Sequence, residues 1–188
     1  MKPTFLTLFT SIALLTAAPG QAENSDQAKL KQEAVSIVKR FGGTLKPELK
    51  KAIQTGGPAH AITVCSEKAP AIAQQLSTET GWSVKRVSLK PRNQNSAVPD
   101  DWERQVLEQF DKRQAAGESA DAMAVAEVVD GKFRFMKAQG VEPVCLNCHA
   151  AQVKPEVESA LKEKYPADKA RGYTLGQIRG AFSLSTNF

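Results

Sequence analysis

Residues 124–139 read AVAEVVDGKFRFMKAQ, two short runs rich in β-branched and aromatic side chains that are joined by Asp130 and Gly131. Asp-Gly between two such runs favours a two-residue hairpin turn, because both turn positions need a left-handed backbone. The stretch therefore predicts an antiparallel hairpin. The strands and helices predicted on either side of the hairpin indicate the fold class.

Two further strands and two helices are predicted around this hairpin. Residues 82–89, WSVKRVSL, alternate and are rich in valine, and residues 173–185, YTLGQIRGAFSLS, read as a loop followed by a strand. Residues 100–117, DDWERQVLEQFDKRQAAG, repeat apolar side chains every four positions, with Asp100 or Asp101 as the cap and Gly117 as the end. Residues 154–166, KPEVESALKEKYP, predict a short helix.

The N-terminal half predicts three helices. Residues 25–41 form an amphipathic pattern with Ser25 as a possible cap, Gly42-Gly43 is expected to interrupt it, and residues 46–56 give a second helix before Gly56-Gly57-Pro58. In the third, residues 58–81, one stripe at gaps of three or four residues predicts inward-facing Ile62, Cys65, Ala69, Ile72 and Leu76. Pro70 is expected to bend or end that helix near Ala69.

This mixture of helices with mostly antiparallel strands predicts an α+β fold, a sheet with helices on one side. The mature chain, residues 23–188, is of single-domain size.

Residues 1–22, MKPTFLTLFTSIALLTAAPGQA, combine Lys2, an apolar run and small residues before Ala22, which is typical of a cleaved signal peptide. We expect a periplasmic protein with no membrane span after signal removal, because no later run approaches about 18 apolar residues. The formal net charge of +5 is spread among acidic residues, and with export this argues against nucleic acid as a partner.

Residues 142–151, EPVCLNCHAA, contain the spacing of c-type haem attachment in Cys145, Cys148 and His149. Two thiols at this spacing form thioethers to the two haem vinyl groups, and the adjacent imidazole is placed beneath the iron. The cofactor expected from this motif is one covalent haem c.

Two other chemistries are open to the same cysteines. A zinc site could use Cys65, Cys145 and Cys148 with either His149 or His60, but the adjacency of Cys148 and His149 strains joint ligation of one small ion. A thioredoxin-like dithiol is disfavoured because no βαβ pattern surrounds the pair.

If His149 is the fifth ligand of a haem iron, the sixth is open between His60, Cys65, Met123, Met136, a lysine and no protein ligand at all. Met123 and Met136 lie in strand-like runs, where packing is the commoner role. Cys65 is the odd cysteine of three in an oxidising compartment, and composition leaves an iron ligand and an inert core thiol equally open.

Four segments together resemble a family of small bacterial haem c proteins, classified as a domain of unknown function. These segments are AITVCSEKAPAIA (61–73), SLKPRNQNSAVPDDWE (88–103), CLNCHA (145–150) and GYTLGQIRGAFSL (172–184). The resemblance covers nearly all of the mature chain. It implies a PAS-like antiparallel sheet with the N-terminal helices packed on it.

The same resemblance implies that the iron is held by His149 and the Cys65 thiolate, in a pocket between the Cys65 helix and the sheet. Arg92 and Arg179 are candidates for contact with the haem propionates.

Two protein ligands would leave no open iron position, so we expect electron transfer at a low-potential centre and no enzymatic turnover. The alternative is a redox or gas sensor for NO or CO, in which Cys65 leaves the iron on reduction. Either role needs a partner protein, a redox partner in the first case. A zinc-stabilised structural module is the third alternative.

Overall fold

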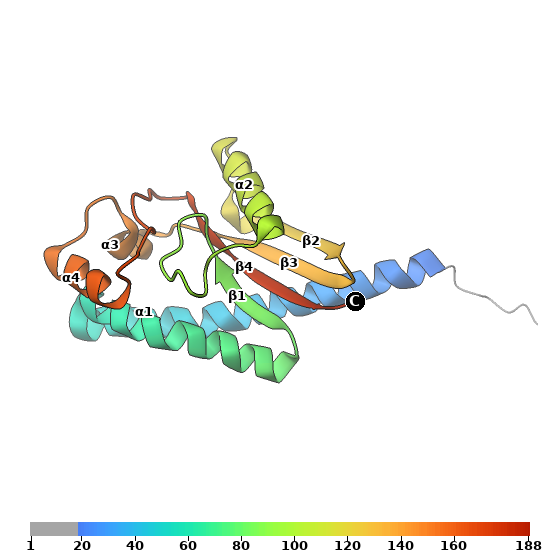
Figure 1. Cartoon of the computed structure of the whole chain (residues 1–188), viewed down its shortest axis with the longest axis horizontal. Coiled ribbons are helices and arrows are strands. Elements are labelled where there is room, and N and C mark those ends of the chain that lie inside the picture. Colours follow the sequence, from blue (N-terminus) through green and yellow to red (C-terminus); the bar gives the residue numbers. More distant parts are fainter. Residues whose placement is uncertain (1–18) are drawn as a thin grey trace, which may run out of the picture.

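The computed structural model describes residues 19–188, in which a long helical hairpin and a second helix enclose an antiparallel sheet (Figure 1). The predicted signal peptide, residues 1–22, lies mostly outside the described residues, and its cleavage stays a prediction. Among the described residues, no helix has the length and apolar character needed to cross a membrane.

The sheet contains four strands in the order β1-β4-β3-β2, and all neighbours are antiparallel. They are β1 (Ser83–Val87), β2 (Ala124–Val129), β3 (Lys132–Gly140) and β4 (Ile178–Asn187). The central β4 comes from the C-terminal end of the chain. The prediction of an α+β fold with an antiparallel sheet is confirmed.

The hairpin of β2 and β3 forms where the sequence predicts it. Val129 pairs with Lys132, and Asp130 and Gly131 take φ values of 51° and 71° in the turn between them. Both values lie in the left-handed region, which is why this two-residue connection uses Asp-Gly.

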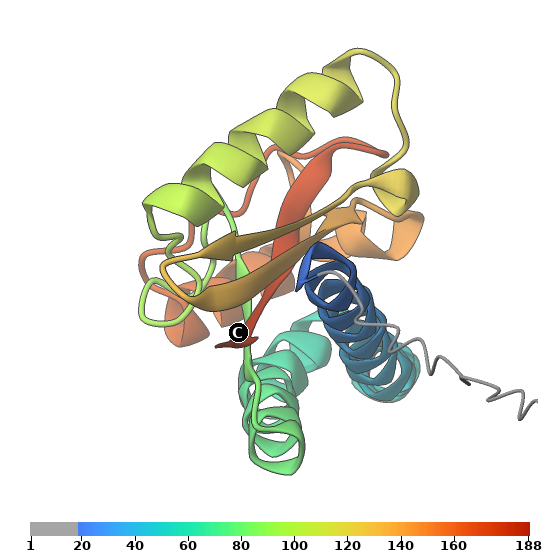
Figure 2. The same cartoon turned by 90° about the vertical axis from the view of Figure 1, so that its right-hand side faces the viewer.

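Helix α1 (Pro19–Thr80) folds back on itself at Gly57, so that its two halves lie side by side under one face of the sheet (Figures 1 and 2). Gly57 has φ 75° and ψ 179°. Only glycine takes that φ without strain, and the following Pro58 favours an extended ψ at the residue before it. The chain therefore turns at Gly57.

Two expectations about this region are wrong. The helix runs through Gly42-Gly43, and it has already begun at Pro19, so Ser25 is not its cap. The helix also does not end at Pro70. Packing of the flanking residues against the sheet outweighs the local cost of a glycine, about 1 kcal/mol.

Both halves of α1 contribute to a core on one face of the sheet. The buried side chains are Ala34, Ile37, Phe41, Ala69, Ile72 and Leu76 from α1, with Trp82, Val84, Phe133, Phe135, Phe182 and Leu184 from the sheet and its entry. The expected packing of N-terminal helices on the sheet is confirmed.

Helix α2 (Asp101–Ala115) covers the opposite face of the sheet, so the expectation of helices on one side only is wrong. Its Val106, Leu107 and Phe110 are buried against side chains of β1, β3 and β4. Asp100 caps the helix, as one of the two residues predicted, and accepts from the Glu103 backbone N–H at 2.9 Å.

The segment between β3 and β4 gathers at one end of the sheet. It contains the short helices η2 (Pro143–Cys145) and α3 (Leu146–His149), then α4 (Pro155–Lys164), which packs against α1 through Ile62, Val157 and Leu161. The remaining short helix, η1 (Ala120–Ala122), leads into β2. This arrangement brings the Cys145–His149 motif to α1.

Candidate functional site

The motif is held at the end of the sheet by backbone hydrogen bonds from the segment that leads into β4. Val141 N–H donates to the Gln177 carbonyl at 2.9 Å, and Tyr173 N–H donates to the His149 carbonyl at 3.0 Å. These bonds tie both ends of residues 141–149 to residues 173–177. The positions of the motif side chains are therefore set by a frame that is distant in sequence.

The two motif cysteines are free, partly buried thiols that point to different neighbours. Cys145 packs against Val141, Ala170 and Tyr173, and its sulfur accepts from the Glu142 backbone N–H at 3.3 Å. Cys148 packs with the α1–α4 core, and its sulfur lies 4.0 Å from the Pro58 carbonyl, just after the turn in α1.

The imidazole of His149 is fixed in one tautomer by its two nitrogen contacts. Nδ1 lies 2.8 Å from the Ala170 carbonyl, which can only accept, so Nδ1 carries the proton. Nε2 is left with its lone pair and accepts from Arg179 Nε at 3.3 Å. Burial lowers the pKa of His149 to about 2, and the positive charges of Arg179 and Arg92 act in the same direction. His149 is therefore neutral, and the Nε2 lone pair is the one that could bind a metal ion.

Cys65 lies in the second half of α1, partly buried, on the stripe whose other four members are buried. Burial raises the pKa of the Cys65 thiol, while the charges of Arg86 and Arg92 oppose that shift. Burial also raises the pKa of Cys148; Arg92 lowers it, and Cys65 is close enough to add to the rise. Cys65 and the motif thus lie near each other, on different elements.

Two other sixth-ligand candidates lie on the opposite face of the sheet. Met123 and Met136 are fully buried in the core between α2 and the sheet, so the packing interpretation of both is confirmed. His60 is exposed on α1.

No group of three or more His, Cys, Asp or Glu side chains among the described residues is arranged to hold a metal ion. The thiols and His149 do not converge on one small ion, which counts against the zinc alternative.

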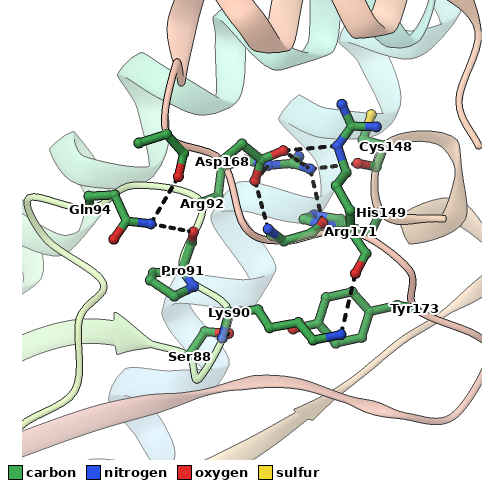
Figure 3. Close-up of polar contacts among 12 residues, drawn as sticks. Ser88, Lys90, Pro91, Arg92, Gln94, Cys148, His149, Asp168, Arg171 and Tyr173 are labelled. Carbon is green, nitrogen blue, oxygen red and sulfur yellow. Dashed lines mark hydrogen bonds and ion pairs between the residues drawn. The ribbon is translucent and has the colours of Figure 1, made fainter. Parts of the chain in front are cut away.

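Arg92 links the motif to two other parts of the chain (Figure 3). Its guanidinium donates to the Cys148 carbonyl at 2.5 Å, to the Ala170 carbonyl at 3.3 Å and to Asp168 at 3.2 Å. The side chains of Arg92 and Asp168 are only 12% and 7% exposed. Arg92, predicted as a candidate for binding propionates, therefore braces the loop that carries the motif.

Asp168 holds the Arg92 guanidinium in place. It accepts from the Ala170 backbone N–H at 2.8 Å and from Arg171 Nε at 3.0 Å. Burial alone would raise the pKa of Asp168, but Arg92 and the hydrogen bonds outweigh burial and lower it. The carboxylate is therefore ionised and fully partnered at neutral pH.

Two other arginines lie at the same site without such a partner. Arg86, on β1, has its guanidinium 5.2 Å from the centre of the Phe41 ring, and Arg179, on β4, lies 5.8 Å from the centre of the Tyr173 ring. Burial lowers the pKa of Arg179 to about 10 and also lowers that of Arg86. Arg179 therefore stays charged at neutral pH.

A sequence model of the Tll0287-like family matches residues 18–187. The chain belongs to the Tll0287-like family. Its fold resembles the crystal structure of the cyanobacterial haem protein Tll0287, with a TM-score of 0.64 and 23% identity over 91% of this chain and 97% of that one. The search of curated proteins finds no match.

In this Tll0287-like chain, a cavity of about 340 Å³ lies apart from the motif. It lies between α2 and the β1–β4 side of the sheet, and its lining includes Leu107, Asp111 and Tyr173. Tyr173 also meets the His149 ring edge-on, at 6.2 Å between ring centres. Neither the motif cysteines nor Cys65 line this cavity, so the cavity is separate from the candidate iron ligands.

The partners that orient the motif were not found from the sequence of this Tll0287-like chain. Asp168, Ala170 and Arg86 belong to no short pattern, and the contacts of Asp168 and Ala170 with Arg92 or His149 join residues 21 to 78 positions apart. Arg92 and Arg179, in the 88–103 and 172–184 segments, are the parts of this arrangement that the sequence does indicate.

Proposed function

We propose that this chain is an exported haem c protein that transfers electrons. Cys145 and Cys148 would form the two thioethers, and His149 and Cys65 would bind the iron. The observation that carries the proposal is the tautomer of His149: Nδ1 donates to Ala170, and Nε2 is left with a lone pair, in a motif whose two thiols are free. Second-shell bonds of this kind orient metal-binding histidines.

The residues fit a haem better than a small ion. The thiols of Cys145 and Cys148 pack in different side-chain clusters, and they do not form a compact ligand cluster with His149. Arg179 donates to Nε2, so iron binding there requires that flexible guanidinium to move away. The surrounding excess of arginine suits a cofactor that carries carboxylates.

A haem held in this way would supply a one-electron centre. Binding of the iron by His149 and Cys65 together would leave no position for a substrate, so we propose electron transfer and not catalysis. A thiolate ligand donates electron density to ferric iron, and ligand identity can shift haem potentials over about 0.8 V. The centre is therefore proposed to have a low potential.

The export and partner proposals come from the sequence. Residues 1–22 are proposed as a cleaved signal peptide that directs the chain to the periplasm, where a redox partner protein would exchange electrons with it.

The second candidate function is a redox or gas sensor at the same site. It is favoured by the location of Cys65 on α1, an element separate from the motif, and by the turn at Gly57 that precedes this half of the helix. Cys65 could therefore leave the iron while Cys145, Cys148 and His149 stay in place.

Spectra of the matured protein test the ligand set. Cys65→Ala is expected to change the low-spin ferric spectrum and to raise the midpoint potential, because the thiolate donor is lost. Ser66→Ala is the matched control: Ser66 is the next residue on α1, and its hydroxyl donates to the Thr63 carbonyl. An unchanged spectrum in Cys65→Ala would show that Cys65 is only a packing residue.

Exposure of the ferrous protein to CO separates the two functions. A carrier with two firmly bound protein ligands is expected to show no CO spectrum in the wild type, whereas Cys65→Ala binds CO. Rapid CO binding by the wild type would favour the sensor.

A further inference from the structure

Four guanidinium groups and two carboxylates lie around the His149 site. Arg92 pairs with Asp168, and Arg171 pairs with both Asp168 and Glu158, which leaves Arg86 and Arg179. Among the residues that the structure describes, neither Arg86 nor Arg179 has a carboxylate within ion-pair distance. The site therefore carries two positive charges that the protein itself does not neutralise.

Both guanidinium groups are partly buried, and an unpaired charge is costly when it is removed from water. Arg86 points to the α1 side of the sheet, since its guanidinium lies over Phe41, and no hydrogen bond from that guanidinium is found within residues 19–188. Two such charges on adjacent strands indicate an anionic ligand with two negative groups.

Arg179 has a further reason to change its partner. Its Nε donates to Nε2 of His149, the same atom that would bind iron. Once Nε2 binds a metal its lone pair is used, so Arg179 loses its acceptor. A carboxylate carried in by the cofactor would replace the lost acceptor.

We propose that Arg86 and Arg179 each bind one propionate of the haem, and that Arg92 binds neither. The assignment rests on the proposed haem function. It differs from the sequence expectation for Arg92, whose guanidinium is engaged by Asp168 and by the carbonyls of Cys148 and Ala170. Arg86 appears in no sequence motif. It is selected because it lies on β1, next to β4, and because its charge acts on both Cys65 and His149.

The test is resonance Raman spectroscopy of the propionate bending modes in matured protein, with the midpoint potential measured on the same samples. Arg86→Gln and Arg179→Gln are each expected to shift these modes and to lower the potential, because a positive charge that stabilises the ferrous haem is lost. Arg86→Lys and Arg179→Lys are expected to keep most of the potential. Arg113→Gln removes the same charge from α2, where Arg113 pairs with Glu118, and should change neither signal.

The outcomes separate the two proposals. A wild type without haem overturns both. A wild type with haem, whose propionate modes are unchanged in both Arg86→Gln and Arg179→Gln, overturns the arginine assignment alone. If a glutamine variant fails to mature, the lysine variant at that position decides: shifted modes support the contact, and unchanged modes contradict it.

Discussion

At the scale of single residues, the motif side chains are held by backbone carbonyls and by a charge pair. Ala170 fixes the His149 ring, and Arg92 joins the Cys148 carbonyl to Asp168. A protonated Nδ1 and an unprotonated Nε2 follow from that one carbonyl contact. Loss of the Arg92–Asp168 pair would thus disturb the orientation of the motif, while the thiols and the imidazole themselves would stay chemically unchanged.

Asp168→Asn is expected to destabilise the protein by about 3 kcal/mol at pH 7, because it leaves the buried Arg92 charge without a carboxylate. The pKa of Asp168 is lowered in the folded state, so its stabilisation is complete above the unfolded pKa, near 3.8, and is lost as pH falls through the folded pKa. Urea denaturation of both forms from pH 7 downward should therefore show the difference shrinking below about pH 4.

The matched control is Asp26→Asn, which removes an exposed carboxylate paired with Lys29, with side chains 62% and 71% exposed. It is expected to change the free energy of unfolding by less than about 0.5 kcal/mol. A difference between wild type and Asp168→Asn that stays constant down to pH 3 would contradict the assigned role of Asp168.

The sequence predicted the donor residues but not their supports. The spacing of Cys145, Cys148 and His149 is a local pattern, so it could be read directly. The contact of Arg92 with Asp168 joins positions 76 apart, and no periodicity in the chain encodes it. The separation of Met123 and Met136 from the motif likewise follows from which face of the sheet each occupies.

At the scale of elements, the hairpin turn of α1 controls where Cys65 lies. Both halves of α1 pack on the same face of the sheet, and the turn brings Pro58 next to Cys148. The break at Gly57 was predicted, because Gly before Pro is a strong local signal. The expected interruption at Gly42-Gly43 was wrong because the helix there is held by packing of Ile37 and Phe41 against the sheet, which is a property of the folded chain.

Gly57→Ala and Gly43→Ala form a matched pair on one helix. No atom lies within 4 Å of a Cβ added at either position, so steric contact does not distinguish them. Gly57 has φ 75°, where alanine is strained, and Gly57→Ala should cost about 1–2 kcal/mol. Gly43 is helical, and Gly43→Ala should stabilise by about 0.5–1 kcal/mol.

Urea denaturation of the two variants gives the comparison. If both alanines stabilise the protein, α1 does not turn at Gly57 through a left-handed glycine. The sulfur of Cys65 would then not be held near the motif in the way described.

At the scale of the whole molecule, the sheet separates two environments. The α2 face holds Met123 and Met136 in a closed core, while the motif packs against α1 at one end of the sheet. The overall fold is shared with the solved structure of a haem protein. The sequence predicted the strands, the hairpin and the C-terminal half well, because each has a local signal. It missed the second covered face, since the side of a sheet on which a helix packs is a tertiary property.

The most direct test of the central claim is the haem that stays with the polypeptide after acid–organic extraction of protein produced with cytochrome c maturation. We predict one haem per wild-type chain retained after extraction and none retained in Cys145→Ala/Cys148→Ala. A wild-type chain that is colourless, or whose haem is fully extracted, would contradict the account.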